Sequence, residues 1–211
     1  MKRLPFVYKL DEGKKEAALT AISGFKNELH SVVKAAGIEN FSIWTVDNFL
    51  FVYGEFPDEF APCTSSAAAF KAYDAALKEL GTVQAAQGTL PLMYHDIGIV
   101  REDKSLIRHR VFVTKLKDGC AAEYKARHDK LVAARGDKVS EGPESNFTIW
   151  NANGYIFGYC ELVKSFDHPM TEEEKASTIA WETRQLEIMD WLTDDVDWIT
   201  GQKHPAIQRV D

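Results

Sequence analysis

The feature that most constrains this chain is an internal repeat with a period of 106 residues. Shifting the 211-residue sequence by 106 positions aligns two segments of about 50 residues without a gap. A period this long indicates two domains of one fold, since solenoid repeats are much shorter. The best-matched positions are mostly aromatic or apolar: Phe6-Val7 with Phe112-Val113, Asn40-Phe41 with Asn146-Phe147, Ile43-Trp44 with Ile149-Trp150, Phe51 with Phe157, Tyr53 with Tyr159 and Glu55 with Glu161.

The first copy is expected to contain four strands and two helices. Runs of β-branched and aromatic residues predict strands, and apolar residues at helical spacing predict helices. Gly37 marks the end of the first helix, and Asp47-Asn48 predicts a tight turn between two strands. In chain order the expected elements are a strand at 4–10, a helix at 14–36, strands at 41–46 and 49–56, a helix at 66–80 and a strand at 91–100.

The second copy repeats this order. A hairpin turn is predicted at Asn153-Gly154, and Thr171 followed by Glu174 predicts the capping box of a helix. The expected elements are a strand at 111–116, a helix at 120–139, strands at 146–150 and 155–162, a helix from 171 to about 195 and a last strand in the tail, within 198–210.

The order β-α-β-β-α-β is that of a ferredoxin-like unit. Its four-stranded antiparallel sheet carries helices on one face only, so the other face needs a cover. We therefore predict an α+β protein of two tandem ferredoxin-like units, 1–105 and 106–211, packed sheet against sheet as a fused dimeric α/β barrel. Residues 101–105 are the predicted linker, and pairing of two such chains into a homodimer stays open.

Composition excludes several classes of function. The net charge is −7 and Lys and Arg form no stripe, so nucleic acid is not an expected partner. No apolar run reaches the roughly 20 residues that cross a bilayer, and no signal peptide precedes the first strand, so we expect a cytoplasmic protein without membrane contact. Cys63, Cys120 and Cys160 are widely spaced and the six histidines are scattered, so neither a disulfide nor a metal site is predicted.

A candidate site lies at the start of the first helix of the second copy. Tyr124 and His128 are four residues apart, so a helix places them on one face. A phenol and an imidazole side by side can hold and move protons near pH 7. The alternative interpretation is a Tyr-His pair on the surface of an amphipathic helix.

The second copy resembles the L-rhamnose mutarotase family. The resemblance rests on Glu123-Tyr124-Lys125-Ala126-Arg127-His128-Asp129, Asn146-Phe147-Thr148-Ile149-Trp150 and Phe157-Gly158-Tyr159-Cys160-Glu161. It covers most of residues 110–190. The resemblance implies a ferredoxin-like dimeric α/β barrel that interconverts the α and β anomers of L-rhamnose or a related 6-deoxy sugar without a cofactor.

The resemblance also implies roles for individual residues. His128 corresponds to the family's general acid, and Tyr124 to a residue that contacts the sugar. Phe147 stands where the family has a substrate-contacting tyrosine, so that hydroxyl is missing here. Trp181 lies near a Trp-Trp pair of the family, but its neighbours Ala180 and Glu182 break the pair.

The first copy departs further from the family pattern. Ala18 and Ile22 stand where the second copy has Tyr124 and His128. A polar pair is thereby replaced by a packing pair. We expect the first unit to be a non-catalytic cover and the second to hold the one site of the chain.

Other residues are candidates for sugar binding. Trp150 and Trp181 could cover the apolar face of a pyranose, and Arg127 and Glu161 could bind hydroxyls. Each also has a structural interpretation. Trp150 and Glu161 recur in the first copy, which favours a packing role for the tryptophan and a structural hydrogen bond for the glutamate. Trp181 lies in a helix with apolar residues, which favours a place in the core. Arg127 is typical of an ion-paired surface residue.

Three functions remain open from the sequence. The first is a cofactor-free aldose mutarotase with His128 as acid and base and Tyr124 as its partner. The second is a binding or sensing module that kept the pocket and lost the chemistry, because fold alone does not give function. The third is another small-molecule reaction, such as that of a monooxygenase or decarboxylase.

Overall fold

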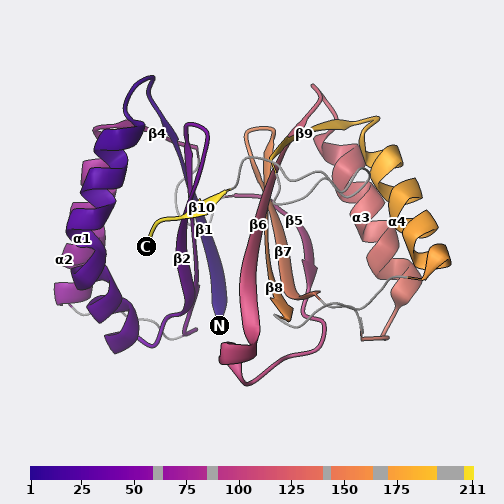
Figure 1. Ribbon diagram of the computed structural model, residues 1–211, viewed down its shortest axis with the longest axis horizontal. Coiled ribbons are helices and arrows are strands. Elements are labelled where there is room, and N and C mark those ends of the chain that lie inside the picture. The colour runs from indigo at the N-terminus through magenta and orange to yellow at the C-terminus, as the bar shows by residue number, and fades with distance from the viewer. Residues whose placement is uncertain (59–63, 85–89, 140–143, 164–170, 194–206) are drawn as a thin grey trace. The chain divides into compact units, whose positions relative to one another are not determined.

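The protein has a mixed α+β fold. A computed structural model describes residues 1–58, 64–84, 90–139, 144–163, 171–193 and 207–211, and within them four α-helices and two antiparallel sheets (Figure 1). The chain divides into two compact units, one formed by 1–90 with 208–211 and the other by 91–207. No described helix is long and apolar enough to span a membrane.

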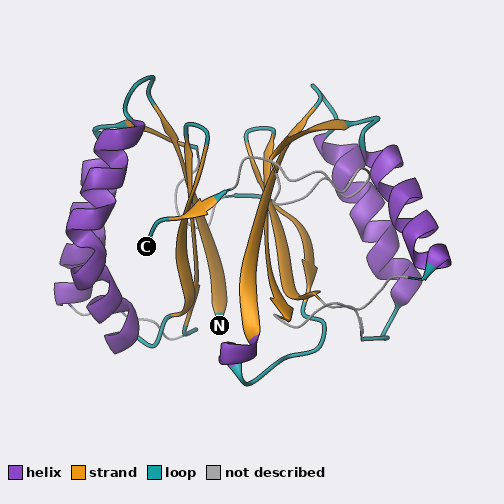
Figure 2. Cartoon of the chain, in the orientation of Figure 1, coloured by secondary structure: helices purple, strands orange, loops and turns teal. Residues whose placement is uncertain are grey.

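The first unit has a five-stranded sheet with both of its helices on one face (Figure 2). The strand order is β10-β2-β3-β1-β4, and all neighbours are antiparallel. Its elements are β1 (Lys2–Leu10), α1 (Lys15–Ala35), β2 (Glu39–Val46), β3 (Phe49–Phe56), α2 (Thr64–Lys78), β4 (Gly81–Val83) and β10 (Gln208–Arg209).

An apolar core fills the space between the helices and the sheet of this unit. Ala18 and Ile22 of α1 are buried against strand residues such as Ile43. Phe25 of α1 meets Tyr73 of α2 edge-on, with ring centroids 6.1 Å apart. The two helices and the sheet therefore close on one another through side chains without charge.

The second unit has the same layer arrangement (Figure 2). Its antiparallel strands lie in the order β5-β7-β8-β6-β9, and α3 and α4 cover one face. Its elements are β5 (Leu92–Asp96), the 3₁₀ helix η1 (Lys104–Leu106), β6 (Ile107–Leu116), α3 (Ala121–Arg135), β7 (Glu144–Ala152), β8 (Tyr155–Val163), α4 (Glu172–Gln185) and β9 (Met189–Thr193).

Two predicted strand assignments are wrong. The strand predicted at 91–100 as the last of the first copy is β5, which pairs with β7 in the second unit. The last strand of the first copy is instead β4, whose three residues are too short for a periodic signal. The predicted tail strand reaches back to the first unit, where β10 pairs with β2, while positions 194–206 lie outside the described residues.

The predicted helix from 171 to 195 is too long. The Thr171 capping box is confirmed, because its side chain accepts from the Glu174 N–H and the Glu174 carboxylate accepts from the Thr171 N–H. The helix ends at Gln185, however, and β9 pairs with β6 from Met189 on. No Gly or Pro marks this end. Tertiary packing ends the helix here, because Ile188 and Met189 are buried in the core of the unit.

The repeated residues lie on both faces of each sheet, and one group of them lies on the face that bears no helix. Side chains alternate along a strand, and Ile149 and Ile156 point to the helix side, so Trp150, Phe157 and Glu161 point to the other. In both units an asparagine with positive φ donates its side-chain amide to the repeated glutamate: Asn40 to Glu55 at 3.1 Å and Asn146 to Glu161 at 3.3 Å. The repeat thus preserves a structural hydrogen bond.

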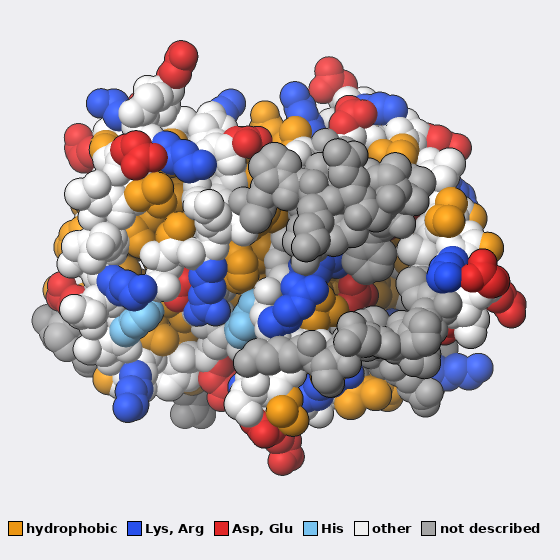
Figure 3. Space-filling view, in the orientation of Figure 1, with side chains coloured by type: hydrophobic (Ala, Val, Ile, Leu, Met, Phe, Trp, Pro, Cys, Tyr) orange, Lys and Arg blue, Asp and Glu red, His pale blue; other side chains and the backbone are white. Residues whose placement is uncertain are grey.

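The described part of the face drawn in Figure 3 carries side chains of both charges, Lys and Arg as well as Asp and Glu, and shows no continuous basic band.

Candidate active site

A cavity of about 410 Å³ opens between the helices and the sheet of the second unit. It lies where the first unit has its closed apolar core. Its walls are one face of α3, one face of α4 and the inner sides of β5, β6 and β7. The volume falls in the range of small-molecule sites.

The α3 wall is a single stripe of side chains. Tyr124, His128, Leu131 and Arg135 all line the cavity, and their spacings of four, three and four residues keep them on one helix face. Tyr124 and His128 are buried at 2% and 6% exposure, so the surface interpretation of this pair does not hold.

His128 has a defined tautomer. Its Nδ1 lies 2.9 Å from the backbone carbonyl oxygen of Tyr124, and because a carbonyl only accepts, Nδ1 carries the proton. The unprotonated nitrogen is then Nε2, which makes no hydrogen bond to the described residues. Aromatic rings surround the imidazole: Tyr124 at 4.4 Å, Tyr94 at 5.3 Å and Trp181 at 5.4 Å between centroids.

Burial sets the protonation states of this group. Desolvation lowers the pKa of His128 below its usual 6.5, although the Tyr124 carbonyl and Asp129 act in the opposite sense. Desolvation, with a smaller effect of Glu182, raises the pKa of Tyr124 well above 10. At neutral pH the site therefore holds a neutral imidazole that can accept a proton beside a neutral phenol that can donate a hydrogen bond.

The sheet wall carries two ion pairs. Arg135 of α3 pairs with Asp96 of β5, and the Tyr94 hydroxyl donates to the same carboxylate at 3.2 Å. Arg110 of β6 lies 3.2 Å from Glu144 of β7. Burial raises the pKa values of both Tyr94 and Glu144. Because the cations and carboxylates are paired with each other, this wall offers polar atoms with little net charge.

Some predicted residues lie at the cavity. Phe147 and Trp181 line it together with Tyr124 and His128. Tyr94 packs edge-on against Phe147, with ring centroids 5.5 Å apart, and its hydroxyl donates to Asp96.

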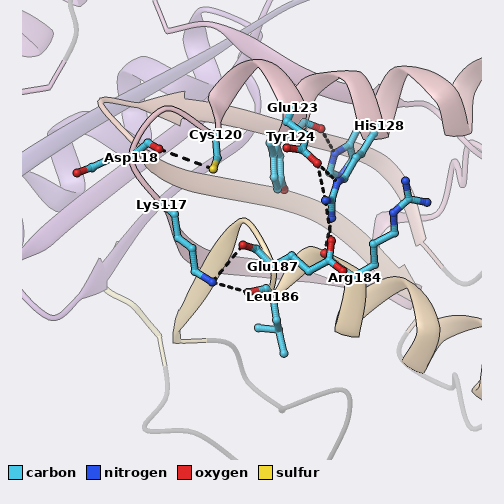
Figure 4. A network of polar contacts seen from close by, with 10 residues as sticks. Lys117, Asp118, Cys120, Glu123, Tyr124, His128, Arg184, Leu186 and Glu187 are labelled. Carbon is cyan, nitrogen blue, oxygen red and sulfur yellow. Dashed lines mark hydrogen bonds and ion pairs between the residues drawn. The ribbon is translucent and has the colours of Figure 1, made fainter.

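Three predicted residues lie elsewhere. Trp150 and Glu161 are on the helix-free face of the sheet, and Glu161 accepts from Lys104 at 2.9 Å as well as from Asn146. Arg127 is buried at 7% exposure and donates to Glu123 at 2.5 Å, to Glu187 at 2.9 Å and to the Arg184 carbonyl (Figure 4). It joins α3 to the end of α4, and none of the three residues lines the cavity.

Sequence reasoning missed several residues of the cavity. Arg135 could have been found, because it continues the helical stripe of Tyr124 and His128. Tyr94 and Asp96 could not, because they belong to a strand assigned to the first copy. Arg110, Glu144, Glu182 and Gln185 carry no motif, and their place follows only from the packing of β6, β7 and α4.

The residues of the first unit at the matching positions form no comparable site. Ala18 and Ile22 are buried at 0% and 1% exposure within the apolar core. Neither can transfer a proton. Within the described residues, no group of three or more His, Cys, Asp or Glu side chains is placed to hold a metal ion.

Fold and site together define an α+β protein with a cavity of small-molecule size, lined by aromatic rings and a buried imidazole. Residues 109–209 match the family model of L-rhamnose mutarotase, which confirms the resemblance over just under half of the chain. The match coincides with the unit that holds the cavity.

Comparison with solved structures found a candidate monooxygenase from Fusobacterium nucleatum subsp. nucleatum. The two chains share 10% identity with a TM-score of 0.44, over 98% of this chain and 95% of the other. No curated protein sequence matches the chain significantly.

Proposed function

We propose that this protein is a cofactor-free aldose mutarotase that interconverts the anomers of L-rhamnose or a related 6-deoxy sugar. The observation that carries the proposal is His128, a buried neutral imidazole with its Nε2 unpaired among the described residues, beside Tyr124 in a cavity of about 410 Å³. The family match over residues 109–209 supports the same reaction class.

The proposed reaction needs one proton acceptor and one proton donor. His128 Nε2 takes the proton of the anomeric hydroxyl, the C1–O bond to the ring oxygen breaks, and C1 becomes an aldehyde carbon. The ring oxygen then takes this proton from His128, while the Tyr124 hydroxyl donates a hydrogen bond to the sugar. After the aldehyde turns, both transfers run backwards and the ring closes with the other configuration. A well-placed acid or base typically accelerates such a step 10²–10⁴-fold.

The remaining walls suit a sugar. Rings of Phe147 and Trp181 can face the C–H groups of a pyranose, while the paired charges of Asp96, Arg135 and Glu144 can bind hydroxyls. In this proposal Trp150, Arg127 and Glu161 are structural residues. The Tyr94 hydroxyl makes the sugar contact for which Phe147 lacks a hydroxyl.

We further propose that the two units arose by duplication and form a fused α/β barrel, with the first as non-catalytic cover. The repeated aromatic residues on the helix-free faces, such as Phe51 and Phe157, support this arrangement, since a sheet needs cover on both faces. Truncation to residues 91–207 should then expose this face and give an aggregating fragment, which gel filtration would detect.

The function is tested by measuring the anomer exchange of L-rhamnose with NMR saturation transfer. The protein should accelerate exchange above the rate in buffer at equal pH. Binding of the sugar without faster exchange would instead favour a binding module, and neither binding nor exchange with any of several 6-deoxy sugars would reject the proposal.

The dependence of the rate on pH tests the role of His128 as the proton acceptor. Because burial lowers the pKa of His128 below 6.5, the neutral form of its imidazole predominates at pH 7. We expect kcat/KM to be constant from about pH 7 to 8 and to fall as the pH drops through a value below 6.5. Saturation transfer with the buffer-catalysed rate subtracted gives this profile. A rate that rises on acidification would show that the imidazolium, as an acid, is the required form.

A further inference from the structure

The side chain of Gln185 stands out among the walls of the cavity. It is the last residue of α4, its exposure is 1%, and it lines the cavity. Within the described structure neither its amide oxygen nor its amide nitrogen has a hydrogen-bond partner. Buried side-chain amides are nearly always hydrogen-bonded, so an amide without protein partners asks for an explanation.

The backbone that carries this amide is fixed at the end of α4. Lys117 donates to the carbonyl oxygens of Leu186 at 2.8 Å and Glu187 at 3.1 Å, and Arg127 donates to that of Arg184 (Figure 4). Leu186 and Glu187 follow the last helical residue, so their carbonyls lack the partners of a helix interior, and the Arg184 carbonyl also accepts from the Glu187 N–H at 3.3 Å. Two cations from neighbouring elements therefore hold the backbone on both sides of Gln185.

We propose that Gln185 determines ligand specificity by binding two hydroxyl groups of the sugar, one as donor and one as acceptor. An amide offers an acceptor oxygen and a donor nitrogen on the same carbon, and neighbouring hydroxyls of a pyranose present the matching pair. Any water that serves the amide in the free protein is replaced on binding. The inference rests on the proposed function and adds that the site selects sugars with a matching pair of neighbouring hydroxyl groups.

The position of Gln185 agrees with this role. It shares one face of α4 with Trp181 and Glu182, at spacings of four and three residues, and all three line the cavity. Trp181 is in ring contact with His128. The amide is thus on the same helix face as a ring that touches the proposed acid-base group, and being neutral it leaves the charge around that group unchanged.

The test uses Gln185→Met, which keeps the length of the side chain and removes its hydrogen bonds. Loss of two hydrogen bonds should raise the Kd for L-rhamnose about 10- to 100-fold. The melting temperature should stay equal or rise, because the substitution removes a buried amide without protein partners. The pH profile of exchange should keep its shape. Gln185→Leu provides a second variant if the first fails to fold.

A panel of monodeoxy analogues of L-rhamnose separates hydrogen bonding from packing. For an analogue that lacks one of the two bound hydroxyls, Gln185→Met should raise the Kd by a smaller factor than it does for L-rhamnose, because only one hydrogen bond is left to lose. Thr183→Val, on the exposed side of α4, is the matched control and should change neither Kd nor melting temperature.

Three results would overturn the inference. An unchanged Kd in Gln185→Met, with wild type still catalysing exchange through His128, rejects the role of Gln185 and leaves the proposed function standing. A strongly lowered melting temperature with unchanged Kd assigns the amide to the fold. If wild type neither binds nor converts any sugar, the proposed function fails first and takes this inference with it.

Discussion

Replacing His128 with Asn should lower the protein-catalysed rate of anomer exchange about 10²–10⁴-fold. The asparagine amide can still bond to the Tyr124 carbonyl, which His128 contacts through Nδ1 at 2.9 Å, but it cannot accept a proton near pH 7. The loss should appear in kcat, whereas the Kd for the sugar should change little, since the surrounding rings remain. Saturation transfer and sugar titration by NMR measure the two quantities separately.

The control for this variant is the same substitution at His30, an exposed histidine of α1 in the first unit. His30→Asn should leave exchange unchanged. Equal exchange rates for His128→Asn and wild type would remove the imidazole from the mechanism. Loss of binding together with loss of rate would instead indicate that the ring mainly shapes the cavity.

The local part of this site was predictable from the sequence. The helix that begins near Cys120 places Tyr124, His128 and Arg135 on one face, and this follows from spacing alone. Alternation along β7 likewise separates Phe147 and Ile149, which line the cavity, from Trp150, which does not. Applied strictly, the alternation rule excludes Trp150 from the cavity wall on the sequence alone.

The non-local part was not predictable. Tyr94 and Asp96 reach the cavity because β5 pairs with β7, and pairing between distant strands leaves no trace in the periodicity of either one. The position of Gln185 depends on where α4 stops, and that end is fixed by Lys117 and Arg127 from other elements rather than by a Gly or Pro in the helix itself. Tertiary contacts override local signals at both places.

Gly158 of β8 makes room for one of the rings that line the cavity. It lies directly opposite Phe112 of β6, and a Cβ built on it would lie 2.0 Å from the Phe112 ring. In the first unit the matching pair is Phe6 opposite Val52. The glycine therefore lets the ring lie against the strand, where it packs edge-on with Phe147 at 5.9 Å and forms part of the cavity wall.

Gly158→Ala should push the Phe112 ring into the cavity, because the strand no longer leaves room for it. We expect a loss of about 1–3 kcal/mol in the free energy of unfolding, as for other overpacked cores, and a rise in the Kd for L-rhamnose of roughly tenfold or more. Urea denaturation and sugar titration measure these effects. Gly24→Ala is the matched control. It should raise the free energy of unfolding by about 0.5–1 kcal/mol, since alanine favours the helix over glycine and the new Cβ meets nothing within 4 Å.

A second substitution tests the cause. If the displaced ring blocks the cavity, Phe112→Leu combined with Gly158→Ala should restore part of both stability and binding, because a smaller side chain fits beside the new methyl group. Independent, additive losses in the double variant would mean that the two residues do not interact in this way. Unchanged sugar affinity in Gly158→Ala would mean that the ring finds room outside the cavity, so that the glycine serves the sheet rather than the site.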